Sequence, residues 1–234
     1  MKKIKQVVLL SLLTFVTYAP MTWATTGFTA SDSKIYTNKI TGISFRYPSD
    51  LTYKEVITDN SNSKESFEGG KSIDVFFNNK DSQNIFSLSM ETKNYKSWLY
   101  ETPTSTDFNC KNPLTYKNGV TCKNAQLSNN KFNLSTNYDN IEASPIFNTR
   151  ALLKNKNKND YANLIFNFQP IDLSQKINNN YTVTDNDAVN KKYTNFIKTS
   201  SFNVLNNKNL SNHDTKRRSQ FEKILMSVRF IKNN

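Results

Sequence analysis

Glycine, histidine and cysteine are scarce in this sequence, and each scarcity narrows the chemistry open to the protein. Only 5 of the 234 residues are glycine, which argues against the glycine-rich loops that cradle phosphate groups. No nucleophile-elbow, HExxH or Walker motif occurs. Asp185 and Asp187 flank Asn186, but this stretch lacks the glycine and distal glutamate of a calcium loop, so turn or capping use is expected. The sequence therefore predicts no cofactor and no metal.

His213 is the only histidine, and it stands beside Asp214 in a polar stretch. Neither a catalytic triad nor a zinc cluster can be assembled around it without further ligands, so we expect an ordinary surface histidine and predict no catalytic residue. Paired carboxylates remain open, because glycoside hydrolysis needs only two acids. Asp172, Asp185 and Asp187 are candidates only because they are present.

Cys110 and Cys122 are the only thiols, and their short spacing favours a structural disulfide in an oxidising compartment. Between them stand Pro113 and the dipeptide of residues 118–119, Asn-Gly, a strong signal for a hairpin turn. A redox pair or a metal site is the alternative. The first normally has CxxC spacing, and zinc needs more ligands than this chain supplies.

The N-terminus has the three parts of a secretory signal peptide. Three of the first five residues are lysine, an apolar stretch covers residues 7–16, and Ala24 follows Pro20 as a small residue at a cleavage site. Cleavage after Ala24 would make Thr25 the mature N-terminus. The sequence thus predicts a signal peptide over residues 1–24 and a flexible lead-in over 25–33.

A membrane anchor is the alternative interpretation of this segment. A span needs about 20 apolar residues, whereas this stretch is shorter and is followed by Pro20. No cysteine lies near the cleavage site, so a lipid-anchored lipoprotein is not expected, and no transmembrane span is expected after cleavage. The short basic start is typical of bacteria and predicts a periplasmic or secreted protein. Export also disfavours nucleic acid as a partner, and no nucleic-acid-binding motif occurs.

The chain is basic, with a formal charge of +12, of which three charges belong to the signal lysines and +9 remain after cleavage. One interpretation is attraction to an anionic surface such as lipid headgroups or polysaccharide. The other is codon bias, because lysine and asparagine are both abundant. Lys216, Arg217 and Arg218 form the only run of three consecutive positive residues. They are the candidate anionic-surface contact, although a solvated helix face is the simpler interpretation.

Alternating apolar residues predict several strands. The clearest runs cover residues 43–47, 51–57, 73–77, 86–90 and 132–138, and residues 146–153 and 161–168 form the clearest long hairpin.

Helices are expected mainly late in the chain. Residues 185–198 form a candidate with Asp185 as N-cap, residues 202–212 read as an Asn-rich loop, and a short helix is possible over 95–100. Residues 214–227 form the best candidate, because Phe221, Ile224 and Leu225 fall on one face. Strands followed by helices predict an α+β fold with a central antiparallel sheet, in a single domain over residues 34–231.

Two segments resemble the PsbP-like family. Residues 41–48, TGISFRYP, are similar to the opening "GxSFxYP" strand of that family, and residues 221–230 are similar to its closing helix and terminal strand. The resemblance implies an α-β-α sandwich with helices on both faces of the sheet. It also implies a binding or assembly role, because the family includes a photosystem II subunit and many exported bacterial proteins without a known role. No functional residue can be transferred, since the shared pattern is apolar and structural.

Together these features favour an exported, non-catalytic bacterial envelope protein that binds or helps to assemble another envelope component. Two alternatives stay open. One is an envelope hydrolase with paired carboxylates, which needs two acids facing each other in a cleft. The other is an electrostatic binder of anionic lipid or polysaccharide, which needs a contiguous basic patch.

Overall fold

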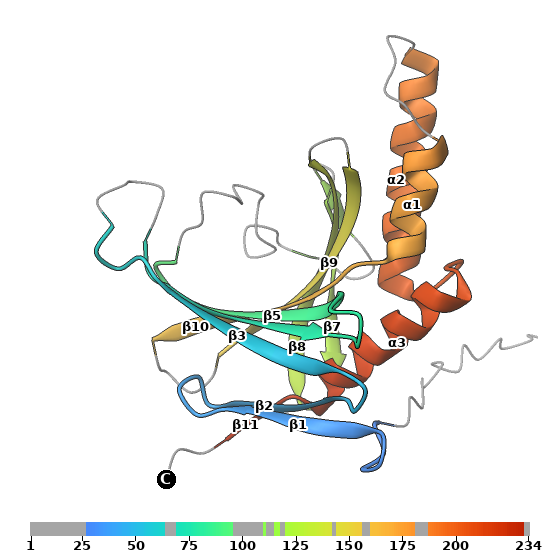
Figure 1. The fold of residues 1–234 in the computed structure, drawn as a ribbon. Helices are drawn as coiled ribbons and strands as arrows, with labels where there is room; N and C mark the ends of the chain where they lie inside the picture. The colour runs from blue at the N-terminus through green and yellow to red at the C-terminus, as the bar shows by residue number, and fades with distance from the viewer. Residues whose placement is uncertain are drawn as a thin grey trace, which may run out of the picture.

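The computed structural model describes residues 27–63, 69–95, 110, 115–117, 120–141, 144–155, 160–180 and 187–231. Two antiparallel sheets and three helices make up this part of the chain (Figure 1). The α+β class and the antiparallel sheet predicted from the sequence are confirmed. Within the described ranges, no helix combines the length and the apolar character needed to cross a membrane.

The large sheet has eight strands in the order β3-β4-β5-β10-β9-β8-β7-β6. Their bounds are Thr52–Asp59 (β3), Lys71–Asn78 (β4), Asn84–Thr92 (β5), Thr115–Lys117 (β6), Val120–Leu127 (β7), Asn130–Ile141 (β8), Ser144–Lys154 (β9) and Tyr161–Phe168 (β10). The predicted hairpin of residues 146–153 and 161–168 is β9 with β10, where Leu164 pairs with Leu153. Lys117 pairs with Val120, which leaves two residues for the predicted Asn-Gly turn; these two lie outside the described residues.

The small sheet has the order β1-β2-β11, with bounds Ser33–Asn38 (β1), Ile43–Pro48 (β2) and Arg229–Phe230 (β11). Ile43, Phe45 and Tyr47 on β2 are buried, as their alternation predicts. These side chains contact the large sheet. The ring centroid of Phe45 lies 5.7 Å from that of Phe77 and 5.5 Å from that of Phe166.

Three helices follow the strands, namely Ile171–Asn180 (α1), Asp187–Asn206 (α2) and Asn212–Ser227 (α3). Helix α3 matches the predicted helix over 214–227. Helix α2 continues through residues 202–206, so the expected loop there is wrong; Val204 and Leu205 are buried and hold this last turn against the core. Asp185, the expected N-cap, and most of the expected short helix over 95–100 lie outside the described residues.

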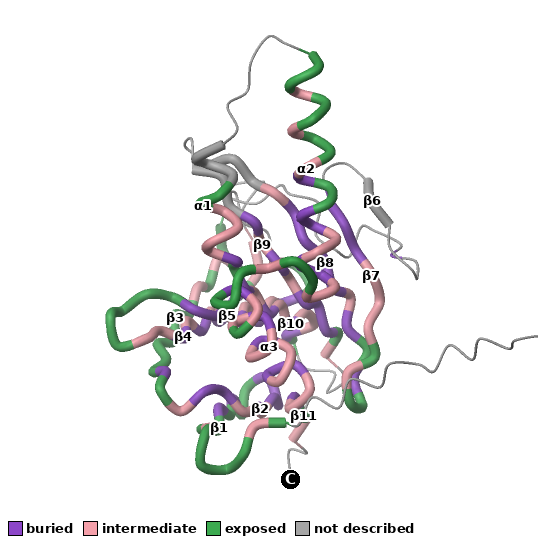
Figure 2. The backbone as a smooth tube through the Cα atoms, turned by 90° about the vertical axis from the view of Figure 1, so that its right-hand side faces the viewer, coloured by how far each residue is buried: buried purple, intermediate pink, exposed green. Residues whose placement is uncertain are grey.

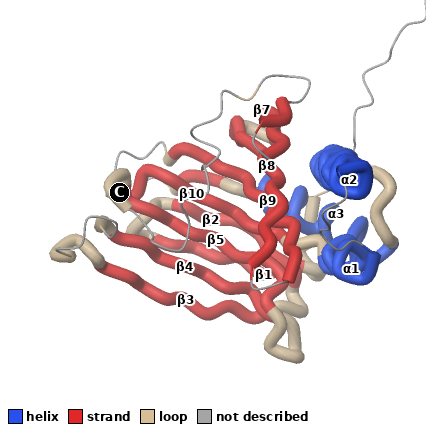
Figure 3. The backbone as a smooth tube through the Cα atoms, turned by 90° about the horizontal axis from the view of Figure 1, so that it is seen from above, coloured by secondary structure: helices blue, strands red, loops and turns tan. Residues whose placement is uncertain are grey.

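The three helices and the small sheet all cover the same face of the large sheet. Phe221 of α3 lies 5.6 Å from Phe168 between ring centroids, and Tyr193 of α2 bonds to Tyr138 of β8 through the two hydroxyl groups. Phe45 and Phe221 therefore pack on the same row of inward side chains, which also carries Phe77. Figure 3 shows the helices at one end of the sheet, away from β3.

The expected α-β-α sandwich is therefore wrong, because the described helices do not enclose the sheet from both sides. The second layer is a composite of a small sheet and helices, and the large sheet keeps a face that none of these elements covers. The physical reason lies in the strands of the large sheet. Most of their residues on that face are polar, so a helix packed there would bury hydroxyl, amide and charged groups.

Candidate functional site

The face of the large sheet opposite the helices is called the polar face here. Successive residues of a strand point to opposite faces, so the residues between the buried apolar ones lie on it. Its polar members on four neighbouring strands are Ser72, Asp74, Ser87, Ser89, Glu91, Asn163, Asn167, Arg150 and Lys154. Phe76, Leu152 and Ile165 interrupt them.

Two carboxyl groups lie diagonally across neighbouring strands on this face. Ser72 pairs with Glu91 and Asp74 pairs with Ser89, so Asp74 and Glu91 are diagonal neighbours, about 7 Å apart between their backbones. The Asp74 carboxylate accepts hydrogen bonds from Ser89 Oγ at 2.5 Å and from Ser72 Oγ at 3.0 Å. These two hydroxyl groups fix one acid of the pair.

Glu91, like Asp74, is half-buried. Burial, with a smaller effect of the neighbouring Asp74, raises its pKa to about 7, and Arg150 and Lys154 act in the opposite direction. Near neutral pH the Glu91 carboxyl group is therefore present in both its protonated and its ionised form. Such a group can donate or accept a proton toward a ligand on the polar face.

Replacing Glu91 by glutamine should make the protein more stable above neutral pH. Because the folded pKa is raised from 4.5 to about 7, folding favours the protonated acid, and stability falls as the pH rises between these two values. We expect the Glu91→Gln variant to gain about 2 kcal/mol in free energy of unfolding at pH 8, after a discount for partial solvation, and to match the wild type at pH 4. Urea unfolding at both pH values measures this; an equal difference at both would contradict it.

A groove of about 950 Å³ opens at the end of the strands nearest Glu91. It lies beside the start of β4 and the end of β5, and its lining includes Lys71, Lys93, Asn94, Tyr95 and Asp160. These side chains line one groove with two cations, an amide, a phenol ring and a carboxylate. The shape of this groove depends on the glycine at position 70.

Gly70 has φ +77°, and a Cβ atom there would lie 2.4 Å from the backbone nitrogen of Tyr95. Any side chain at Gly70 would push the end of β5 away.

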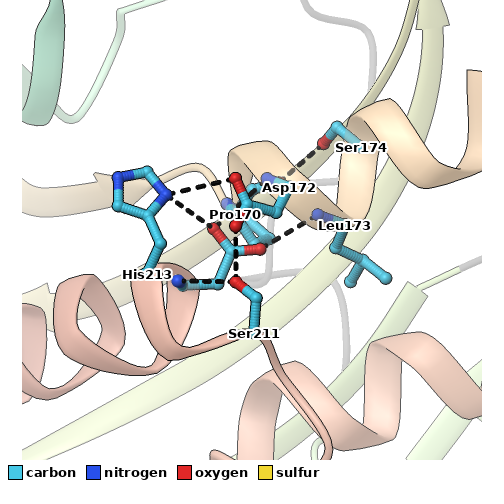
Figure 4. Close-up of polar contacts among 7 residues, drawn as sticks. Pro170, Asp172, Leu173, Ser174, Ser211 and His213 are labelled. Carbon is cyan, nitrogen blue, oxygen red and sulfur yellow. Dashed lines mark hydrogen bonds and ion pairs between the residues drawn. The ribbon is translucent and has the colours of Figure 1, made fainter.

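The lone histidine lies in a second polar cluster, where α3 begins beside α1 (Figure 4). His213 Nδ1 lies 3.2 Å from Asp172 Oδ1 and 4.0 Å from Asp214 Oδ1. Ser211, the N-cap of α3, donates to Asp172 Oδ2 and accepts from the backbone nitrogen of Asp214. Hydrogen bonding from Ser211, with a smaller effect of His213, lowers the pKa of Asp172.

The hydrogen bonds assign this cluster to holding two helix ends together. One ligand atom each of Asp172, His213 and Asp214 lies within 4.8 Å of the others, a spacing that a metal ion would need. However, Asp214 is fully buried, and its carboxylate already accepts the backbone N–H groups of Leu173 at 2.9 Å and of Asp172 at 3.4 Å. It thereby caps the N-terminus of α1 from the first turn of α3.

Removing this cap should destabilise the protein. We expect the Asp214→Ala variant to lose about 2 kcal/mol in free energy of unfolding, because two helix N–H groups lose their acceptor in a buried place. Asp172→Ala is the matched control, since that side chain is partly exposed, and should lose less than about 1 kcal/mol. Urea unfolding of both variants measures the difference, and equal losses would contradict the assignment.

The other candidate residues predicted from the sequence lie at different places in the fold. Cys110 and Cys122 are joined by the predicted disulfide, with Cα atoms 5.5 Å apart. Asp187 is exposed at the start of α2, away from Asp172, so these two do not form a carboxylate pair. Asp185 lies outside the described residues. The pair Asp74 and Glu91 was missed, although both stand at the polar positions of alternating strands.

Lys216, Arg217 and Arg218 do not form one surface. Arg218 is 3% exposed and donates to the backbone oxygens of Val204 and Leu205, so the predicted anionic-surface contact is wrong for Arg218. Arg217 is half-buried, and Lys216 is exposed. A contact of Lys216 or Arg217 with an anionic surface stays a prediction.

Comparison of the chain with protein-family models, with curated proteins and with solved structures found no match.

Proposed function

We propose that the chain is an exported, non-catalytic bacterial envelope protein that binds another envelope component through the polar face. The observation that carries this proposal is the polar face itself, a set of hydroxyl, amide and charged groups on a sheet face that none of the described helices covers. Fixed polar groups on a regular element suit recognition of a polar partner. The signal-like N-terminus and the disulfide of Cys110 with Cys122 support export.

A PsbP-like relationship forms the finer part of this proposal. The two segments that resemble the family lie together in the fold, because β2 pairs with β11 through Ser44 with Arg229 and Ile43 with Phe230. Their contact supports a shared structural unit built from the two ends of the domain. The composite second layer departs from the sandwich that the resemblance implies.

Affinity capture from an envelope fraction tests the binding proposal. Lys154 is exposed on the polar face, and Lys191 is exposed on α2, so Lys154→Glu and Lys191→Glu are matched charge reversals at two places. We expect the wild type and Lys191→Glu to retain the same component and Lys154→Glu to lose it. Equal retention by all three proteins would contradict a partner on the polar face.

A hydrolase with paired carboxylates is the second candidate, and one observation favours it. Asp74 and Glu91 share a face, and the pKa of Glu91 near 7 suits a proton donor. Turnover of a panel of glycan, ester and peptide substrates decides between the two functions. If the purified protein hydrolyses one of them, and Asp74→Asn and Glu91→Gln each abolish that activity in a folded variant, the non-catalytic proposal is wrong.

A further inference from the structure

The groove beside the start of β4 and the end of β5 plays no part in the proposed function. Lys71 lines it at the start of β4, and Thr92 lines it at the end of β5. Each stands one position away from a residue of the polar face, Ser72 and Glu91 respectively. Because successive residues of a strand point to opposite sides of the sheet, Lys71 and Thr92 point away from the polar face. Binding in the groove is therefore independent of binding at the polar face.

Two turns form the walls of this groove. Asn60 and Ser61 stand directly after β3, and Lys93, Asn94 and Tyr95 directly follow β5. Seven of the eight residues of β3, the strand that leads into the first of these turns, are exposed (Figure 2). The volume of about 950 Å³ is at the upper end of the range of small-molecule sites, roughly 300–1,000 Å³. The groove therefore has room for a ligand of more than one ring.

The charges of the groove nearly cancel. Lys71 is paired with Asp59, whose Oδ2 lies 3.2 Å from the lysine Nζ. The lining then contributes one further cation, Lys93, and one carboxylate, Asp160. In a chain with a formal charge of +12, a strongly anionic ligand would be drawn to other parts of the surface at least as well as to this balanced groove. The charge balance favours a neutral ligand.

Three backbone N–H groups at the groove already have acceptors. Lys71 donates its backbone N–H to Thr92 Oγ1 at 2.8 Å, and Tyr95 donates to Thr92 O at 3.0 Å. Asn60 donates to Gly70 O at 2.8 Å. A peptide that adds itself as a further strand needs backbone groups of this kind to be available. Recognition in the groove therefore falls to side chains.

The side chains of the lining suit a ligand with many hydroxyl groups. The amides of Asn60 and Asn94 and the hydroxyl of Ser61 can each both donate and accept hydrogen bonds. Apolar surface in the described lining comes mainly from the Tyr95 ring and Ala162, which leaves little for an apolar ligand. A sugar combines hydroxyl groups, which donate and accept, with a C–H face that packs on an aromatic ring. We propose that the groove binds a neutral oligosaccharide through Asn60, Asn94 and Tyr95.

Binding of short neutral oligosaccharides, screened on a glycan array and then titrated by calorimetry, tests this proposal. We expect the purified protein to bind at least one of them with a dissociation constant below about 1 mM. Asn94→Ala and Tyr95→Ala should each raise this constant at least about tenfold, because each removes a group that contacts the sugar. Tyr95→Phe keeps the ring and should stay within about threefold of the wild type.

Asn195→Ala is the matched control for Asn94→Ala, since Asn195 is exposed on α2, outside the groove. It should bind the same oligosaccharide as the wild type does. Equal midpoints of urea unfolding show that the variants are folded. The proposal is overturned if no neutral oligosaccharide binds, if only anionic oligosaccharides on the array bind, or if Asn94→Ala and Tyr95→Ala bind as tightly as Asn195→Ala.

Discussion

Replacing Arg218 by alanine should lower the free energy of unfolding by about 3 kcal/mol. The guanidinium group is buried and donates from Nε to Val204 O at 3.2 Å and from Nη2 to Leu205 O at 3.4 Å. It thereby donates to carbonyl groups in the last turn of α2, where Val204 O also accepts from the backbone N–H of Asn207 at 3.3 Å. Its Nη1 lies 3.8 Å from Glu222, and the cation lies 5.8 Å from the centroid of the Phe221 ring.

Lys216 provides the control for this prediction, because it stands two residues away in the same basic run and is exposed. Lys216→Ala should change the free energy of unfolding by less than about 0.5 kcal/mol. Arg218→Met keeps the apolar stem but not the donors, so it should lose nearly as much as Arg218→Ala. Urea unfolding of the three variants gives the comparison. A neutral Arg218→Ala would mean that the α2 carbonyls have other partners.

Phe45→Ala should cost about 4 kcal/mol, the typical loss for a buried phenylalanine. The ring is 2% exposed and joins the small sheet to the large one, with centroid distances of 5.1 Å to Tyr36, 5.7 Å to Phe77 and 5.5 Å to Phe166. Its removal leaves a cavity between two sheets, and the rigid strands on both sides limit the collapse around it.

Phe45→Leu and Ile35→Ala test whether the loss of stability comes from the cavity at Phe45. If it does, removal of an exposed apolar side chain has little effect. Leucine refills part of the cavity and should lose less than half as much as alanine does. Ile35 is exposed on β1, so Ile35→Ala should stay within about 0.5 kcal/mol of the wild type. Thermal or urea unfolding measures all three. A loss below about 1 kcal/mol for Phe45→Ala would contradict the packing of the small sheet on the large one.

The strands were predictable from the sequence because their apolar residues alternate cleanly. Ile73, Val75 and Phe77 of β4 all point into the core, as their spacing predicts. Strand β7 was missed because half of the residues in Val120–Leu127 are polar and its role comes from its pairing with β8. Helix α1 was missed for a similar reason, since its stability depends on the cap that Asp214 provides from a distant part of the chain.

The polar residues were harder to predict, because their roles depend on neighbours that only the fold supplies. Lys216 and Arg218 look alike in the sequence, yet one is exposed and the other is buried against the end of α2. Asp74 and Glu91 could be placed on the polar side of their strands by alternation. Their proximity required the register of β4 with β5, and the high pKa of Glu91 required its burial.

Site-specific photocrosslinking in living cells tests the central claim, that the polar face binds an envelope component. A photoreactive amino acid would replace Lys154 on the polar face or Lys191 on α2, both of which are exposed. We expect a cross-linked adduct of one defined mass from position 154 and no such adduct from position 191. The same adduct from both positions, or from position 191 alone, would contradict a binding role for the polar face.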